Sequence, residues 1–438
     1  MRRHWLAPVV AAVLAGVGVA ATLQTPANPR PATNGLTVSD VESTATFCGG
    51  LGTGPAAAVV TLTNTADAPR VVAVREDSTA PGAHRAVTLH LGARASMQIH
   101  PDLAGSWFGL TAIVAGGGVV ASTVAPDGAS APCQASGVTS WSAAGLTTTV
   151  GSHATVELYN PVPTAAVANL TVETANGFLA PAVYQGLAIP GESVLALPLA
   201  TTVVDQAVVG ARLRVVRGSL VVIGVERAGS LVSYATGSAV PRTTWVLPLV
   251  TTVRDATSVI DVANPQSGAV SVRATVALGQ FAIPAQTTSV PGFGVGHITI
   301  SPNPAIPAHG YAAVRLSASG PVSVGLVTGD AAGSLVSSPG APSRAYLLTD
   351  ATGRGFDGVA LANLADASLA LTVTAGTLKA HVRLGPRQVI GLRALVPQLG
   401  QLRGRSVLLH AARADLVVAA TLPTRPAGLV VVTPLHGG

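Results

Sequence analysis

The feature that most constrains this chain is a repeated segment in which one alternating strand ends at an asparagine and a second strand follows a turn. Four segments share this pattern, and they are centred on Asn64, Asn160, Asn264 and Asn363. Their spacings are 96, 104 and 99 residues. The segment AGSLVS occurs at 228–233 and at 332–337, each time starting 68 residues after the asparagine. Two markers at one offset indicate four tandem repeats of about 100 residues.

Within the repeats apolar residues alternate with a period of two, as in ATVELY, ANLTVE and ARLRVV of the second repeat. Asn-Pro, Gly-Glu and Arg-Gly turns separate these runs, which is typical of short strands. The second repeat therefore holds about seven strands, the number of a two-sheet antiparallel sandwich. We predict an all-β chain of four tandem β-sandwich repeats of immunoglobulin-like type. The recurring asparagines are predicted to cap turns, since an asparagine side chain bonds its own backbone two residues on.

One similarity favours a different architecture. The segment LALPLATTVVD at 195–205 resembles WVLPLVTTVRD at 245–255, half a repeat away. Half-repeats of about 50 residues suit the four-stranded blades of a propeller. A β-propeller-like arrangement of half-repeats is therefore the alternative to tandem sandwiches.

The first residues predict where the chain is located. Arg2 and Arg3 precede an uncharged, mostly apolar run at 5–23, long enough to span a bilayer as a helix. We predict an N-terminal transmembrane or signal helix that contacts the membrane, either kept as an anchor or cleaved near Ala21. The rest of the chain is expected to be extracytoplasmic, anchored in the plasma membrane or secreted. The predicted domains are a signal anchor with a Pro-rich tether (1–35), β repeat 1 (36–135), β repeat 2 (136–240), β repeat 3 (241–342) and a basic β repeat 4 (343–438).

Two cysteines, Cys48 and Cys133, are the only ones in the chain. An even pair in an exported protein is typically a structural disulfide, whereas a redox centre would normally be a CxxC motif. We predict that the two cysteines form a disulfide that closes the first repeat.

Several short motifs together resemble a known family. They are FCGG at 47–50, PCQ at 132–134, LYNP at 158–161 and IPGES at 189–193, with Trp141 and Trp245 opening successive repeats. In this combination the chain resembles the actinobacterial secreted or membrane-anchored family known as domain of unknown function 5719. Thr65 and Leu364 replace the proline of the Asn-Pro turn in the first and last repeats. The resemblance implies an actinobacterial cell-envelope location and supplies no catalytic residues.

The sequence contains no recognisable catalytic motif: it has no G-x-S-x-G elbow, no H-E-x-x-H and no phosphate-binding loop. Its histidines are scattered, and carboxylates and cysteines do not cluster with them, so we predict no metal and no cofactor. Only 15 aromatic residues occur in 438, and none alternates with arginines, which argues against nucleic-acid binding. We predict a non-catalytic envelope scaffold or interaction protein rather than an enzyme. The alternative is a cell-wall polysaccharide-binding protein or wall-biogenesis enzyme with an inter-repeat cleft.

Charge is unevenly distributed along the chain. From residue 343 onward ten lysine and arginine residues occur with four aspartates, an excess equal to the formal net charge of +6. A basic last repeat suits an anionic envelope polymer or an envelope protein as partner. The candidate patch for such a partner comprises Lys379, Arg383, Arg387, Arg393, Arg403 and Arg405.

Overall fold

The computed structural model describes residues 43–435, except for 53–56, 81, 127–128, 230, 252–256, 279–280, 301–309, 331–332, 338–344, 351–355, 357–358, 402–405, 415 and 421–429. Its strands form four successive groups, here called units 1 to 4. The predicted helix at 5–23 and the tether at 24–35 lie outside the described residues. Within the described part of the chain no helix is long and apolar enough to cross a membrane.

The strands of each unit follow the period-two pattern of the sequence. Unit 1 contains β1 (Ser43–Gly52), β2 (Val59–Asn64), β3 (Arg70–Ser78), β4 (His84–Leu91), β5 (Ser96–Ile99), β6 (Trp107–Ala115), β7 (Val119–Val124) and β8 (Ser130–Pro132). Unit 2 contains β9 (Ser140–Leu146), β10 (Ser152–Asn160), β11 (Ala166–Thr174), β12 (Gly177–Leu179), η3 (Ala182–Tyr184), β13 (Leu187–Ile189), β14 (Ser193–Pro198), η4 (Leu199–Thr201), β15 (Val209–Arg217), β16 (Val221–Ala228) and β17 (Leu231–Ala235).

Units 3 and 4 are built in the same way. Unit 3 contains β18 (Arg242–Thr251), β19 (Thr257–Ala263), β20 (Val270–Leu278), β21 (Phe281–Val290), β22 (Val295–Ile300), β23 (Gly310–Asp330) and β24 (Gly333–Ser337). Unit 4 contains β25 (Ala345–Asp350), β26 (Val359–Asn363), β27 (Leu369–Ala375), β28 (Leu378–Leu384), β29 (Val389–Gly391), α2 (Leu392–Leu395), η5 (Pro397–Gln401), β30 (Ser406–Ala411), β31 (Leu416–Ala420) and β32 (Val430–Leu435).

Each unit places its strands in two antiparallel sheets. In unit 1 the sheet orders are β1-β6-β3-β4 and β5-β2-β7-β8, and unit 2 repeats them as β9-β15-β11-β12 and β14-β10-β16-β17. In unit 3 the 21-residue strand β23 pairs with β18 and β20 in one sheet and with β19 and β24 in the other. Unit 4 has the orders β28-β27-β30-β25-β32 and β29-β26-β31. The prediction of an all-β chain with several antiparallel sheets is confirmed.

One hydrophobic core lies between the two sheets of each unit. In unit 2, Leu158 of β10 and Val222 of β16 pack in the same buried cluster as Leu170 of β11 and Leu213 of β15. Equivalent clusters fill units 1, 3 and 4. The alternation of the sequence places every second side chain in this core, as the burial of β11 shows from Ala166 to Val172.

The four recurring asparagines lie at corners where the chain passes from one sheet of a unit to the other. The strand before each asparagine (β2, β10, β19, β26) belongs to one sheet, and the strand after it (β3, β11, β20, β27) to the other. At Asn264 the side-chain amide donates to the carbonyls of Gly268, Val290 and Pro291, and its oxygen accepts from the Gln266 amide. Asn64, Asn160 and Asn363 make corresponding bonds. The asparagine therefore ties two turns together, a larger role than the single-turn cap predicted.

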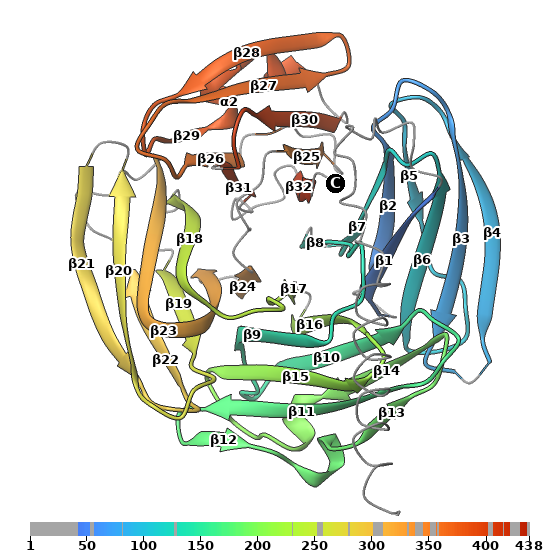
Figure 1. The fold of residues 1–438 in the computed structure, drawn as a ribbon, viewed down its shortest axis with the longest axis vertical. Coiled ribbons are helices and arrows are strands. Elements are labelled where there is room, and N and C mark those ends of the chain that lie inside the picture. Colours follow the sequence, from blue (N-terminus) through green and yellow to red (C-terminus); the bar gives the residue numbers. More distant parts are fainter. Residues whose placement is uncertain are drawn as a thin grey trace, which may run out of the picture.

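Figure 1 shows the four units following one another around a ring, with the last unit beside the first. Strands β4, β12, β21 and β28 lie at the outer rim, and β8, β17, β24 and β32 lie toward the centre. Each sheet takes strands from both halves of its repeat, as β1-β6-β3-β4 does. Half-repeats therefore do not form separate sheets, whereas the placing of the sheets around a common centre is what the propeller alternative predicts.

The predicted disulfide is present, joining Cys48 of β1 to Cys133 just after β8, with Cα atoms 4.5 Å apart. Because it closes a loop across the whole first unit, the chain-entropy model assigns it about 4 kcal/mol of stabilisation. We expect the double variant C48A/C133A to lower the unfolding free energy of unit 1 by that order, measured by native-state hydrogen exchange of β2 and β6. Equal protection with and without the bridge would contradict this expectation.

The corner asparagines give a second prediction. Asn264→Ala removes the hydrogen-bond partner of the Gln266 backbone amide and of three backbone carbonyls. Each buried polar group left without a partner costs about 1–3 kcal/mol. We expect the opening free energy of β19–β22 to fall by about 3 kcal/mol in hydrogen exchange. The control is Asn176→Ala, because Asn176 is exposed and only its backbone amide is bonded. An equally small effect at both positions would show that the corner bonds do not stabilise unit 3.

Candidate functional site

Two members of the predicted basic patch lie side by side on the outer edge strand of unit 4. Lys379 and Arg383 alternate with His381 along β28, and all three side chains are exposed. Among the described strands, theirs pairs with β27 alone. Strands β27, β28 and β30 contain no aspartate or glutamate, so this face, here called the basic face, is cationic without internal neutralisation.

Two further patch residues, Arg387 and Arg393, lie outside strand β28. Arg387 lies in the turn after β28, where it forms an ion pair with Asp366, and like-charge repulsion from it lowers the pKa of Arg315 in unit 3 further than burial alone. Arg393 is exposed on α2. Arg403 and Arg405 lie outside the described residues. Of the described residues of the predicted patch, the structure places Lys379 and Arg383 together on one face of β28.

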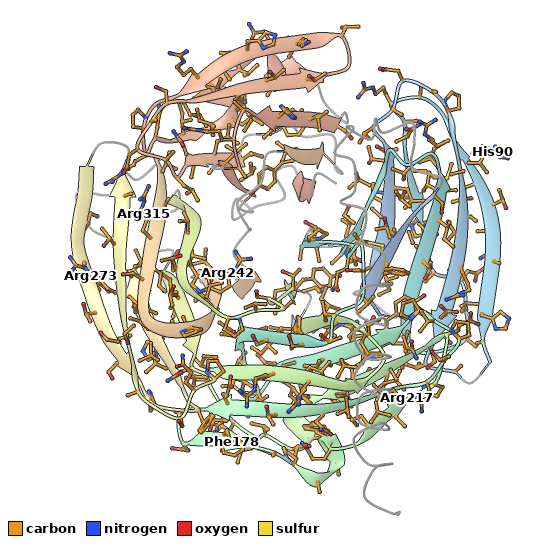
Figure 2. All side chains as sticks on the ribbon, in the orientation of Figure 1. His90, Phe178, Arg217, Arg242, Arg273 and Arg315 are labelled. Carbon is orange, nitrogen blue, oxygen red and sulfur yellow. A yellow bond between two sulfur atoms is a disulfide. The ribbon has the colours of Figure 1, made fainter. Side chains whose placement is uncertain are left out.

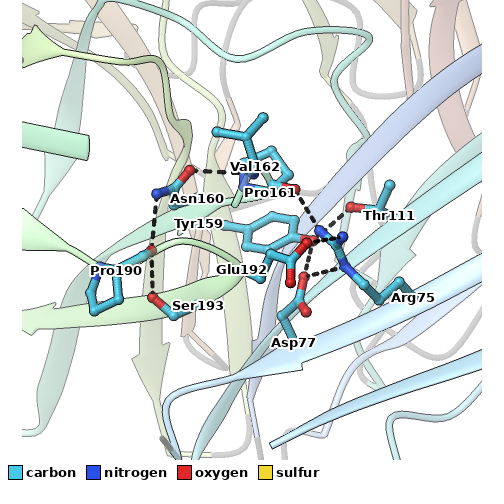
Figure 3. A network of polar contacts seen from close by, with 10 residues as sticks. All are labelled: Arg75, Asp77, Thr111, Tyr159, Asn160, Pro161, Val162, Pro190, Glu192 and Ser193. Atoms are coloured by element: carbon cyan, nitrogen blue, oxygen red, sulfur yellow. Dashed lines mark hydrogen bonds and ion pairs between the residues drawn. The ribbon is translucent and has the colours of Figure 1, made fainter. Parts of the chain in front are cut away.

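Successive units meet at contacts that are here called seams and that were not predicted from the sequence. At the seam of units 1 and 2, the Tyr159 hydroxyl donates to Asp77 at 2.6 Å and lies 2.6 Å from the Thr111 hydroxyl (Figure 3). Arg75 of unit 1 pairs with Glu192 of unit 2 at 2.6 Å and also with Asp77. Burial raises the pKa of Asp77, against the opposing effects of Tyr159 and Arg75.

The FCGG motif belongs to the same seam, and the contacts at this seam explain why the motif contains glycines. Gly50 has a φ of +77° and lies against the Tyr234 ring of unit 2, so a side chain would clash there. Its amide donates to the Glu157 carboxyl at 3.0 Å, and its carbonyl accepts from the Tyr234 hydroxyl. Arg227 stacks over Trp107 of unit 1 with 4.5 Å to the ring centroid. This motif therefore serves packing between units.

Units 2 and 3 are joined by backbone and side-chain contacts. Phe178 of unit 2 packs on Phe293 of unit 3 with ring centroids 5.2 Å apart. The Ser142 and Ser323 hydroxyls lie 2.5 Å apart in the buried interior of the seam. Strand β17 also pairs with β24 in parallel, so one sheet of unit 2 continues into unit 3.

One arginine bond recurs at three seams. Arg75, Arg212 and Arg315 each donate to the carbonyl of the residue directly after the next unit's corner asparagine, namely Pro161, Pro265 and Leu364. Each arginine stands opposite a threonine on the neighbouring strand. Figure 2 shows Arg315 at the end of unit 3 that faces unit 4. In unit 4 the corresponding row holds Thr374 and Leu408 instead.

The fourth seam, between units 4 and 1, contains a recess of about 320 Å³. Strand β32 lies against β7 and β8 there, which closes the ring. Five hydroxyl groups and one guanidinium line the recess, together with Leu408, and they belong to Thr63, Thr65, Ser96, Thr374, Ser406 and Arg94. The Thr63 and Ser96 hydroxyls are 2.9 Å apart, and Ser96 is 3.5 Å from Ser406 across the seam.

Buried carboxyl groups are concentrated near the seams. Burial raises the pKa of Glu157 to about 8, although the Gly50 amide and Arg227 oppose the shift. Burial also raises the pKa values of Glu173, Glu226 and Asp261 to about 7. Glu226 of unit 2 and Asp261 of unit 3 interact across their seam, which raises the pKa of Glu226 further. Within the described residues, no group of three potential ligands is placed to bind a metal.

Comparisons with known proteins identify no family. No family model matches the chain, and no curated protein matches it. Among solved structures, one match is a tetra-tandem repeat in the extending region of a large adhesion protein. It is 14% identical, covers 81% of this chain and 92% of its own, and has a TM-score of 0.12. A likeness at that TM-score carries no argument about fold or function.

The seam carboxyls predict a pH dependence. Glu157 titrates near 8 in the folded protein and near its ordinary 4.5 when unfolded, so the folded state binds an extra proton between these values. We therefore expect the unfolding free energy to decrease as pH rises from about 4.5 to about 8. Glu157→Gln should lower by one the number of extra protons that the folded state binds, so the unfolding free energy should depend less steeply on pH. Urea unfolding at several pH values measures this slope. The control is Asp102→Asn at an exposed ion pair, and an unchanged slope in Glu157→Gln would contradict the assignment.

Proposed function

We propose that this chain is a non-catalytic scaffold of the cell envelope that holds an anionic envelope polymer on the basic face of unit 4. The observation that carries the proposal is the row of Lys379, His381 and Arg383 on one face of an edge strand. Cationic side chains that have no carboxylate beside them attract polyanions and raise their local concentration. An edge strand at the rim is also accessible to a long chain.

The seams support a scaffold role. Buried hydrogen bonds join the units at the first two seams, and apolar packing joins them at the second and third, which holds the units in fixed relative positions. Tyr159 and Ser142 illustrate this, since both are buried and bonded across a seam. A ring held in this way presents the basic face at a defined distance from the other units.

The proposed location is extracytoplasmic, with the N-terminal run at 5–23 as a membrane anchor or signal. The disulfide between Cys48 and Cys133 supports an oxidising compartment. The resemblance of the FCGG, LYNP and IPGES motifs to the actinobacterial secreted family supports an envelope location.

A second candidate function is favoured by one observation, the recess between units 4 and 1. A cell-wall polysaccharide-binding protein, or a wall-biogenesis enzyme, would use an inter-repeat cleft of this kind. The described lining residues supply hydroxyls and one guanidinium, which bind sugars and anions. General acid–base catalysis needs a group that titrates near the working pH, so the lining favours polysaccharide binding over catalysis.

The proposal predicts salt-sensitive polyanion binding. The full-length protein should bind polygalacturonate, and binding should weaken as ionic strength rises because exposed charges are screened. The double variant K379A/R383A should bind roughly thirtyfold more weakly at low salt, since each surface cation contributes about 1 kcal/mol. Isothermal titration calorimetry measures both effects.

The matched control removes the same charge from unit 2. Arg214 and Arg217 are both exposed on β15, and R214A/R217A should bind polygalacturonate nearly as well as the unaltered protein. Dextran, which is neutral, should not bind to the basic face. Equal losses in the two double variants would show that only net charge matters, and the proposed face would be abandoned.

A further inference from the structure

The fourth seam differs from the other three at one pair of positions. The residue before each corner asparagine packs against the preceding unit, and at three seams a glycine or alanine makes room for it. Tyr159 lies on Gly109, Ala263 on Gly210, and Ala362 on Ala313. The strand register places Ser406 at the equivalent position of unit 4, two residues before Leu408, which stands opposite Thr374. Ser406 and Thr63, the residue before Asn64, both line the recess.

This difference accounts for the recess. The facing pair at this seam is a serine and a threonine, whose side chains are polar and too small to fill the space that Tyr159 fills at the first seam. The arginine that bonds the next unit is also replaced, because its row in unit 4 holds Thr374 and Leu408. The units therefore meet at β32 and at the Ser96–Ser406 contact while a polar space remains between them.

The chemistry of the recess is specific. Its five hydroxyls can each accept a hydrogen bond, which matches the hydroxyl groups of a sugar, and the Thr65 hydroxyl also donates to the Gly118 carbonyl. Arg94 uses Nε to bind Asp67 at 2.8 Å, and within the described part of the chain its Nη donors have no acceptor, so they can bind a further one. A guanidinium with these donors binds a carboxylate or phosphate well.

Arg94 is placed at the seam by the fold. Each unit has one residue with positive φ in an equivalent turn, and its backbone amide donates to the carbonyl of the residue two positions after the corner asparagine. These residues are Arg94, Glu192, Phe293 and Arg387. Glu192 and Phe293 contact the preceding unit from this position. Arg94 lines the recess from the same position.

The recess also continues into the basic face. Thr374 lines the recess and is paired directly with Lys379 on β28. Directly opposite residues in an antiparallel pair have Cβ atoms about 5 Å apart on the same face. An anionic chain lying along Lys379 and Arg383 therefore reaches the recess without leaving the sheet.

We propose that the recess between units 4 and 1 binds one anionic sugar unit of a polymer. The anionic group lies on Arg94, and the sugar hydroxyls bond the serines and threonines of both units. A volume of about 320 Å³ is at the small end of ligand sites, which suits one sugar unit rather than a large ligand. This inference rests on the proposed function, since it assigns the point at which the envelope polymer is held.

The test measures binding of two short probes to the full-length protein by calorimetry. Trigalacturonate carries carboxylates, a glycerol-phosphate trimer carries phosphates, and maltotriose is the neutral comparison. We expect at least one anionic probe to bind, and Arg94→Gln to weaken it about tenfold or more. The probe that binds more tightly identifies the anion. Binding of neither anionic probe, or equal binding of maltotriose, would overturn the proposal.

Arg85 offers a closely matched control. Its side chain is 44% exposed and paired with Asp102, whereas that of Arg94 is 43% exposed and paired with Asp67. Arg85→Gln should leave binding of the probes unchanged. Thr63→Tyr introduces at the fourth seam the residue type that Tyr159 provides at the first seam. It should prevent binding of the probe, and hydrogen exchange should show that the cores of units 1 and 4 remain intact. Equal losses in the Arg85 and Arg94 variants would reject the recess.

The two proposals can fail separately. If K379A/R383A weakens polygalacturonate and Arg94→Gln changes neither polymer nor probe binding, the basic face stands and the recess does not. If Arg94→Gln weakens the probes while K379A/R383A has no effect on the polymer, the recess binds its ligand independently and the proposed polymer face is wrong.

Discussion

The structure depends on the hydrogen bonds of four buried asparagine side chains. A corner between two sheets exposes backbone carbonyls that no strand can satisfy, and a buried unsatisfied carbonyl is costly. At each corner the asparagine amide bonds carbonyls from two separate turns while its oxygen holds the turn that follows. An aspartate has no amide donor, and a serine is too short to reach two turns. The same turn carries the positive-φ residue that faces the preceding unit, so the corner also orients the seam.

The seams show how one repeated fold gives four different contacts. The backbone places the same two positions face to face each time, and side-chain size then decides the outcome. Tyr159 against Gly109 gives a buried hydrogen-bonded seam, whereas small residues on both sides give close apolar packing. Ser406 against Thr63 leaves a polar space. Variation at a single pair of positions therefore separates structural contacts from a candidate binding site.

Much of the fold follows from the sequence, because its determinants are local. Alternation predicts strands, and four asparagines at regular spacing predict four equivalent turns. The ring and the exchange of strands between sheets do not follow, since both depend on pairings between residues far apart in the chain, such as Thr111 with Arg75. The basic face was partly predicted, but Arg387 is separated from it by its pairing with Asp366. The recess was missed, although aligning the repeats by position would have shown Thr374 and Leu408 in the row where the other units have the arginine that bonds the next unit.

The long strand β23 has a mechanical consequence. It runs for 21 residues and belongs to both sheets of unit 3, pairing with β18 and β20 in one and with β19 and β24 in the other. Elsewhere the two sheets of a unit are joined by turns, and a pulling force can separate them by straightening those turns. In unit 3 a force along β23 must instead shear several rows of hydrogen bonds at once. Because β24 also pairs with β17 of unit 2, these two units transmit tension as one body.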